Sequence, residues 1–152
     1  TDNLLKAIGE EKYDFIVANY ANADMVGHTS NIVATQRAVE VLDECIGHLL
    51  KKIMLKNGAM IITADHGNAE RKFEVQTQRM SPEHTRNPVP FWLIGKRFYK
   101  EKTEEEVADQ HRPPKGGLLI DIAPTILDLM NLPKPDTMTG ASLINIKTRL
   151  LI

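Results

Sequence analysis

Three short apolar runs constrain the fold of this chain more than any other feature of its sequence. They cover residues 15–18 (FIVA), 59–63 (AMIIT) and 89–94 (VPFWLI), and none alternates apolar with polar residues as a half-exposed strand does. Strands of this kind are buried on both faces. A segment with helical periodicity, residues 31–56, lies between the first two runs, and another, residues 121–130, follows the third. The sequence therefore predicts an α/β fold, with a layered sheet and helices on both of its faces.

Particular residues indicate where the predicted helices and strands begin and end. A short helix is expected at the start of the chain, where Leu4, Leu5 and Ile8 follow a polar residue that can cap it. Asn57 and Gly58 are expected to end the long helix, because both tolerate the left-handed backbone conformation. Pro90 indicates that the strand at residues 89–94 is not hydrogen-bonded at its first residues. The segments 20–30, 65–87 and 96–117 lack periodicity, and the last is expected to be an irregular loop.

Composition excludes several classes of protein. The formal net charge of −1 argues against a nucleic-acid-binding protein and against a polybasic membrane-surface segment. No apolar run approaches the roughly 20 residues of a membrane-spanning helix. The single cysteine, Cys45, excludes an internal disulfide and favours a reducing, cytoplasmic location. With 42% hydrophobic residues among 152, the chain can form one core.

Three of the five histidines lie in polar segments beside the predicted strands. Asp24 and His28 follow the first strand four residues apart, so they would face the same side of a helical turn. Asp65 and His66 directly follow the second strand, and His84 lies shortly before the third. Taken alone, each pattern also has an ordinary explanation, since loop carboxylates cap turns and most histidines lie on the surface.

Together, the three segments predict a metal site, because all of them would meet at one end of the sheet. Carboxylate and imidazole groups are ligands for divalent metals. Five ligands are too many for one tetrahedral ion and suit two ions that share a site, which is the usual apparatus of phosphoryl chemistry. The sequence contains neither a GxxxxGK(S/T) phosphate loop nor a GxSxG elbow. His48 and His111 are interpreted as packing or surface residues.

Four motifs occur in an order that resembles one known family. They are NYANADMVGHTSN, ITADHGNAE, EHTRNPVPFWLIG and DIAPTILDLMNLP. The sequence resembles the C-terminal part of the cofactor-independent phosphoglycerate mutases, members of the alkaline phosphatase superfamily. The resemblance implies that residues 1–152 are a single C-terminal segment of the metal-binding phosphatase domain. The N-terminal piece and the transferase domain would then be absent, and the alkaline-phosphatase-like sheet would be incomplete in this chain.

The resemblance also implies an activity, a metal and a ligand set. The family interconverts 3-phosphoglycerate and 2-phosphoglycerate in glycolysis through a phosphoserine, with two divalent ions. Mn²⁺ is the expected ion, and Mg²⁺, Co²⁺ and Zn²⁺ are alternatives. By resemblance, Asp24, His28 and His84 would bind one ion. Asp65 and His66 would bind the other, together with a serine and an aspartate outside this chain.

The same resemblance implies limits on what the chain does by itself. None of its serines, Ser30, Ser81 or Ser142, is expected to be the nucleophile, so no catalytic residue is assigned. The isolated chain is expected to be inactive towards its phosphoglycerate substrate and to self-associate through an exposed sheet edge. Ala23 stands where the family commonly has proline, and Ser30 where it commonly has glycine.

Two other functions remain open on the sequence. The first is a different metalloenzyme of the alkaline phosphatase superfamily, such as a phosphatase, a phosphopentomutase or a sulfatase. The second is a stand-alone, non-catalytic module that binds a metal or a partner.

Overall fold

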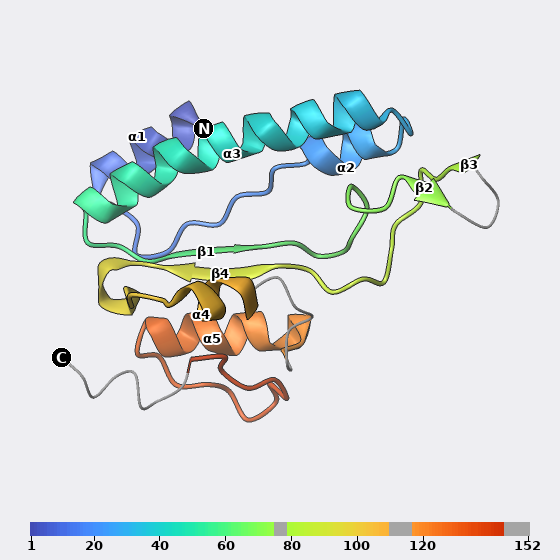
Figure 1. The fold of residues 1–152 in the computed structure, drawn as a ribbon. Coiled ribbons are helices and arrows are strands. Elements are labelled where there is room, and N and C mark those ends of the chain that lie inside the picture. The colour runs from blue at the N-terminus through green and yellow to red at the C-terminus, as the bar shows by residue number, and fades with distance from the viewer. Residues whose placement is uncertain (75–78, 110–116, 145–152) are drawn as a thin grey trace. The chain divides into compact units, whose positions relative to one another are not determined.

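The computed structural model of this chain describes residues 1–74, 79–109 and 117–144 (Figure 1). The chain divides into two compact units, unit 1 (Thr1–Lys96) and unit 2 (Arg97–Ile152). The 3₁₀-helix η1 (Lys96–Phe98) lies where the first unit ends and the second begins. No helix of the described residues is long and apolar enough to cross a membrane.

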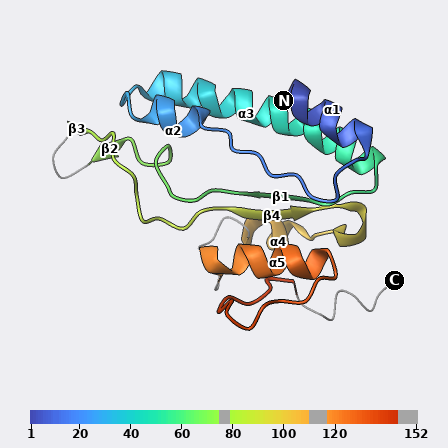
Figure 2. The same ribbon diagram turned by 180° about the vertical axis from the view of Figure 1, so that it is seen from behind.

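Unit 1 combines three helices with two small antiparallel ladders. The helices α1 and α2 both contact the long helix α3, and Figures 1 and 2 show all three along one side of the strands. Strand β1 pairs with β4 from Met60↔Ile94 to Thr63↔Phe91, and β2 pairs with β3. The bounds are α1 (Asp2–Glu10), α2 (Asn22–Gly27), α3 (Ile32–Leu55), β1 (Met60–Thr63), β2 (Phe73–Glu74), β3 (Arg79–Met80) and β4 (Phe91–Ile94).

The register of the β1–β4 ladder positions the rest of the unit. Because the strands are antiparallel, the end of β1 at Thr63 faces the start of β4 at Phe91. The segment after β1 and the segment before β4 therefore leave the ladder at the same end. Figures 1 and 2 show that α2 and the β2–β3 hairpin lie toward this end as well.

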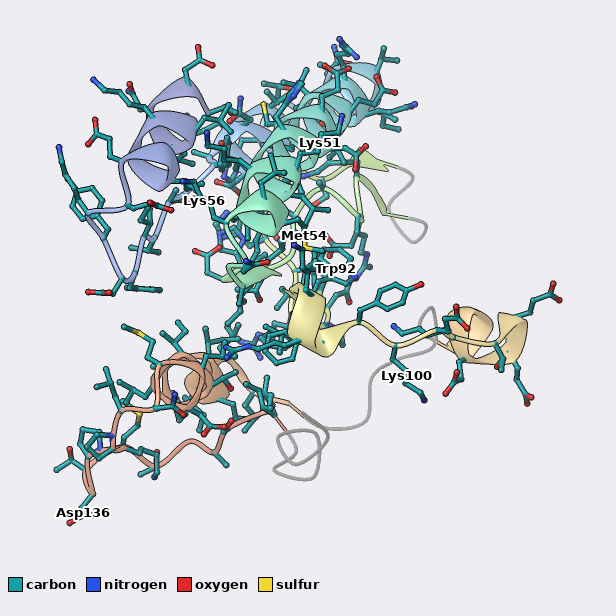
Figure 3. The ribbon with its side chains drawn as sticks, turned by 90° about the vertical axis from the view of Figure 1, so that its left-hand side faces the viewer. Lys51, Met54, Lys56, Trp92, Lys100 and Asp136 are labelled. Carbon is teal, nitrogen blue, oxygen red and sulfur yellow. The ribbon has the colours of Figure 1, made fainter. Side chains whose placement is uncertain are left out.

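Helix α3 begins and ends at residues suited to those positions. Asn31 precedes it in an extended conformation, and its Oδ1 accepts a hydrogen bond from the Ala34 amide at 3.0 Å. Asn57 follows it in the left-handed region, with a φ of 53°. Lys56 Nζ lies 2.7 Å from Glu11 Oε1, joining the end of α3 to the residue after α1 (Figure 3).

Hydrogen bonds to one carboxylate join two segments of unit 2. It contains α4 (Glu104–Asp109), the 3₁₀-helix η2 (Leu119–Asp121) and α5 (Ile122–Leu129). Asp121 Oδ2 accepts from the Leu118 amide at 2.9 Å, and its Oδ1 accepts from the Ala141 amide at 2.8 Å. The segment after α5 is thereby tied back to the start of that helix.

The α/β class predicted from the sequence is confirmed. The helices at the chain start, at residues 31–56 and at residues 121–130 form, as do the strands at 59–63 and 89–94. Pro90 lies outside β4, as predicted. The left-handed stop at Asn57 is also present.

Two predictions of secondary structure are wrong. Residues 15–18 form no strand, and Phe15 and Val17 are 50% and 80% exposed. A strand needs a hydrogen-bonded neighbour, and no described segment pairs with this one. The charged segment 96–117, predicted to be irregular, contains α4. Thr103 and Glu106 begin this helix with a reciprocal capping box, in which each side chain accepts from the other residue's amide, at 3.2 and 3.0 Å.

Candidate metal centre

The three segments that carry the predicted ligands meet at the end of the β1–β4 ladder. Asp65 and His66 follow β1 directly. An isolated bridge pairs Gly67 with Thr85, and the Thr85 amide donates to the Gly67 carbonyl at 2.7 Å. This bridge brings His84, the residue before Thr85, beside the segment after β1.

The third segment is the helix α2. Residues 20–30 showed no periodicity in the sequence, yet residues 22–27 are helical, and the His28 amide donates to the Asp24 carbonyl at 3.0 Å. This turn puts the two side chains on one face, as their spacing required. His28 Nε2 lies 3.4 Å from Asp24 Oδ2.

The five side chains proposed as ligands form one connected cluster. His84 Nε2 lies 3.1 Å from Asp24 Oδ1 and 3.2 Å from His28 Nε2. His66 Nε2 lies 4.0 Å from Asp24 Oδ1 and 3.7 Å from Asp65 Oδ1. The rings of His66 and His84 stack with centroids 3.7 Å apart. Asp65 lies at the margin, with its side chain 89% exposed.

The donor set fits a divalent cation. Asp24, His66 and His84 each offer a ligand atom, and these three atoms all lie within 4.8 Å of one another. Ligand atoms that share one ion at about 2.1 Å stand roughly 3–3.5 Å apart, which is close to the shorter separations in this cluster. Asp24 Oδ1 is buried without a hydrogen-bond partner, although His84 Nε2 is near. A buried carboxylate oxygen without a donor is costly, and a cation would satisfy it.

Asp24 lies between the two ligand groups that the sequence analysis separated. Its Oδ2 is near His28, whereas its Oδ1 is near both His84 and His66. The three-residue cluster consequently contains His66, which the sequence-based assignment had placed with Asp65. The structure brings all five residues together.

Asn68 and Lys72 also belong to this region, and the sequence analysis did not single them out. Both are buried, and Lys72 Nζ donates to Asn68 Oδ1. Asn68 Nδ2 donates to the carbonyls of Pro82 and Glu83 at 3.2 and 3.5 Å, next to His84. Asn68 thus ties the segment after β1 to the segment that carries His84. Its position in the motif ADHGNAE, two residues after His66, is the sequence feature that could have indicated this role.

The charge of Lys72 is set by opposing influences. Burial lowers the pKa of its ammonium group, while the carboxylates of Glu70 and Asp24 act in the opposite direction. Burial prevails, so the pKa of Lys72 lies below its ordinary value.

Comparison with known families decides the family of the chain. The model of the Metalloenzyme superfamily matches residues 1–134. The chain belongs to this superfamily. Membership of the superfamily and the cluster around Asp24 together indicate that the chain uses a divalent metal.

Curated relatives of this superfamily member share one name, 2,3-bisphosphoglycerate-independent phosphoglycerate mutase. The protein of Clostridioides difficile (strain 630) is 49% identical over 145 residues, which cover 95% of this chain and 26% of the relative. The protein of Clostridium botulinum (strain ATCC 19397 / Type A) is 47% identical over 144 residues, with the same coverage. That of Ehrlichia ruminantium (strain Gardel) is 48% identical over 145 residues. The chain spans about a quarter of the length of these relatives.

A solved structure shows the same fold. The phosphoglycerate mutase of Leishmania mexicana, studied at low cobalt concentration, matches with a TM-score of 0.72 and 24% sequence identity. The match covers 92% of this chain and 26% of that chain.

Proposed function

We propose that this chain is the C-terminal, metal-binding part of a 2,3-bisphosphoglycerate-independent phosphoglycerate mutase. Such an enzyme is an isomerase of glycolysis that interconverts 3-phosphoglycerate and 2-phosphoglycerate through a phosphoserine. The observation that carries the proposal is the cluster of Asp24, His28, Asp65, His66 and His84 at one end of the ladder. Relatives at 47–49% identity support it, since all carry this name.

The proposed centre holds two divalent ions. Asp24, His28 and His84 bind one, and Asp65 and His66 contribute to the other. When bound, the ions would activate a hydroxyl nucleophile and stabilise the charge of a transferring phosphoryl group. Mn²⁺ is the ion we propose first, with Mg²⁺, Co²⁺ and Zn²⁺ as alternatives. The cobalt-containing conditions of the Leishmania mexicana structure support Co²⁺ as a probe.

The residues of this chain act by binding and orientation. The Nε2 atoms of His28, His66 and His84 lie at the cluster, so these imidazoles already present a ligand atom to the proposed two-ion centre. Ser81 Oγ accepts from the Glu83 amide at 3.3 Å, and Ser142 Oγ donates to Asp128 Oδ2 at 2.7 Å. The phosphorylated serine is proposed to lie outside the 152-residue chain. The chain is proposed to act in the cytoplasm as part of a larger polypeptide.

Calorimetric titration of the 152-residue chain with Mn²⁺ tests the metal centre. One dominant site is expected, because Asp24, His28 and His84 supply three ligands and Asp65 with His66 only two. His84→Ala should weaken it by at least about a hundredfold, since even the loss of an outer partner costs 10–100-fold. His66→Ala should weaken it less.

His48→Ala is the matched control, because His48 lies on α3 and outside the cluster. It should leave Mn²⁺ affinity unchanged. Absence of Mn²⁺ binding would contradict the metal centre. A larger loss in His66→Ala than in His84→Ala would show that the ligands are divided differently.

A coupled assay for 2-phosphoglycerate tests the mutase activity. The 152-residue chain alone should show no turnover in the usual enzyme range of about 1–10³ s⁻¹. A chimaera with this chain in place of the matching part of the Clostridioides difficile relative should interconvert the two phosphoglycerates. Asp24→Ala in that chimaera should abolish the activity. An inactive chimaera that folds and binds Mn²⁺ would favour a different metalloenzyme function.

A further inference from the structure

Glu70 connects the two loops that carry His66 and His84. It lies four residues after His66 and outside the ligand cluster. Its Oε1 accepts a hydrogen bond from Thr85 Oγ1 and a second from Asn87 Nδ2 at 2.9 Å. Thr85 directly follows His84, so one oxygen of Glu70 holds the backbone on the C-terminal side of that histidine.

The surrounding backbone reinforces this connection. The Thr85 amide donates to the Gly67 carbonyl at 2.7 Å, and the Asn87 amide donates to Thr85 Oγ1 at 3.3 Å. Thr85 is therefore held through its amide and through its hydroxyl. A methyl group at Gly67 would overlap both Thr85 Oγ1 and Glu70 Oε1, so this close approach requires glycine.

The charge of Glu70 suits the role of an acceptor. Partial burial raises its pKa, but hydrogen bonds from Thr85, from its own amide, from Asn87 and from the Asn68 amide outweigh this. The pKa of Glu70 therefore lies below its usual value, and at neutral pH the group is an ionised carboxylate. Hydrogen bonds to a carboxylate are stronger than those between neutral groups.

We propose that Glu70 is a positioning residue of the metal centre, which keeps His84 beside His66 and Asp24 by fixing Thr85 and Asn87. This inference rests on the proposed function, because it assigns Glu70 to the same metal site. A residue that only stabilised the loop would change stability without a specific effect on metal affinity. Glu70 instead acts on the separation between two ligand-bearing segments, so its loss should lower metal affinity.

Mn²⁺ titration of Glu70→Ala and Glu70→Gln measures this role. Glu70→Ala should weaken Mn²⁺ binding by about 10–100-fold, as expected for a partner that orients a ligand. Glu70→Gln keeps an oxygen that can accept both bonds, although more weakly than a carboxylate does, so its affinity should fall by only about threefold. Glu44→Ala is the matched control, because it removes a carboxylate of α3 outside the centre.

Thr85→Val provides an independent variant, because it removes the hydroxyl group that donates a hydrogen bond to Glu70. It should weaken Mn²⁺ binding in the same direction as Glu70→Ala. The double variant should be little worse than Glu70→Ala alone, because both changes break the same contact. Additive losses would contradict a shared network.

Amide hydrogen exchange of the metal-free chain gives a readout that does not depend on metal. Glu70→Ala should speed exchange at the Thr85 amide and leave α3 unchanged, and Glu70→Gln should restore protection. Equal Mn²⁺ affinity in Glu70→Ala and the unmodified chain, or unchanged Thr85 exchange, would overturn the inference. An unmodified chain that binds no Mn²⁺ would contradict the proposed function instead.

Discussion

Gly27 lies where α2 comes closest to the segment that follows β1. A methyl group there would overlap Asn68 Oδ1 and lie 3.1 Å from Lys72 Nζ. Both neighbours are buried and hydrogen-bonded, so neither can move freely. We expect Gly27→Ala to lower the free energy of unfolding by about 1–3 kcal/mol, the usual cost of overpacking. Urea denaturation followed by circular dichroism measures this.

Gly47 offers the control for that substitution. It lies inside α3, and a methyl group there would meet nothing within 4 Å. Gly47→Ala should therefore raise the free energy of unfolding by about 0.8–1 kcal/mol through helix propensity alone. If both alanine variants change stability in the same direction, the close contact at Gly27 is not present in solution.

Ser30 adopts a backbone conformation that favours glycine. Its φ is 56°, in the left-handed region, where a side chain costs roughly 1–2 kcal/mol. Replacing Ser30 with glycine would remove this cost, but the greater freedom of glycine in the unfolded chain offsets part of the stabilisation. Ser30→Gly should therefore stabilise the fold by about 0.5–1 kcal/mol. Ser30→Ala, which keeps the Cβ atom, should bring no such gain in the same denaturation experiment.

At the scale of the element, Asn31 governs the start of α3. Its side chain satisfies the Ala34 amide, one of the free donors of the first turn. Asn31→Ala should cost about 1 kcal/mol of stability. Asn31→Asp keeps an acceptor oxygen and should cost little, and an equal loss in both variants would argue against the cap. Thermal unfolding followed at a helical circular dichroism band measures both.

Asp121 makes unit 2 sensitive to acid. Hydrogen bonds from the amides of Ala141 and Leu118 hold the pKa of this carboxyl below its usual value. Since the folded pKa is the lower one, the stabilisation is fully present above about pH 4 and is lost as pH falls through the folded pKa. The Ala141 and Leu118 amide signals in NMR spectra should therefore shift together in that acidic window.

Asp121→Asn provides the comparison for this titration. The amide side chain cannot ionise, so both signals should be insensitive to pH in the same window. If the shifts persist in this variant, another carboxyl group causes them.

At the scale of the whole molecule, few apolar side chains are fully buried in the part of the chain that the structure describes. Among the described residues, Leu49 is the buried aliphatic side chain, while Val17 and Phe15 remain 80% and 50% exposed. Exposed apolar segments without a hydrogen-bonded neighbour favour association, and a net charge of −1 opposes it weakly. We expect the chain to dimerise or aggregate as its concentration rises, as light scattering can measure.

Val17→Lys should reduce this association, because it places a charge in the unpaired segment. Val33→Lys is the control, since Val33 is about as exposed, at 78%, but lies in the hydrogen-bonded helix α3. A monodisperse monomer at millimolar concentration would show that the unpaired segment is already protected in solution.

Local signals explain how much of this fold was predictable. Helices α1, α3 and α5 follow from periodicity and end signals, because their hydrogen bonds join residues close in sequence. The capping box of Thr103 and Glu106 is also a local signal, although it lies in a charged segment whose composition indicates a loop. Residues 15–18 could not be assigned in this way, since a strand depends on a neighbour distant in sequence.

The sequence by itself determined which residues are proposed as ligands, because acids and histidines stand in polar segments beside the predicted strands. They are Asp24, His28, Asp65, His66 and His84. Their separations were decided only by tertiary structure, through the antiparallel β1–β4 register and the Gly67–Thr85 bridge. The hydrogen bonds of Asn68 and Glu70 were decided there too. Hydrogen bonds between distant segments have no local pattern, because only the folded chain brings their donors and acceptors together.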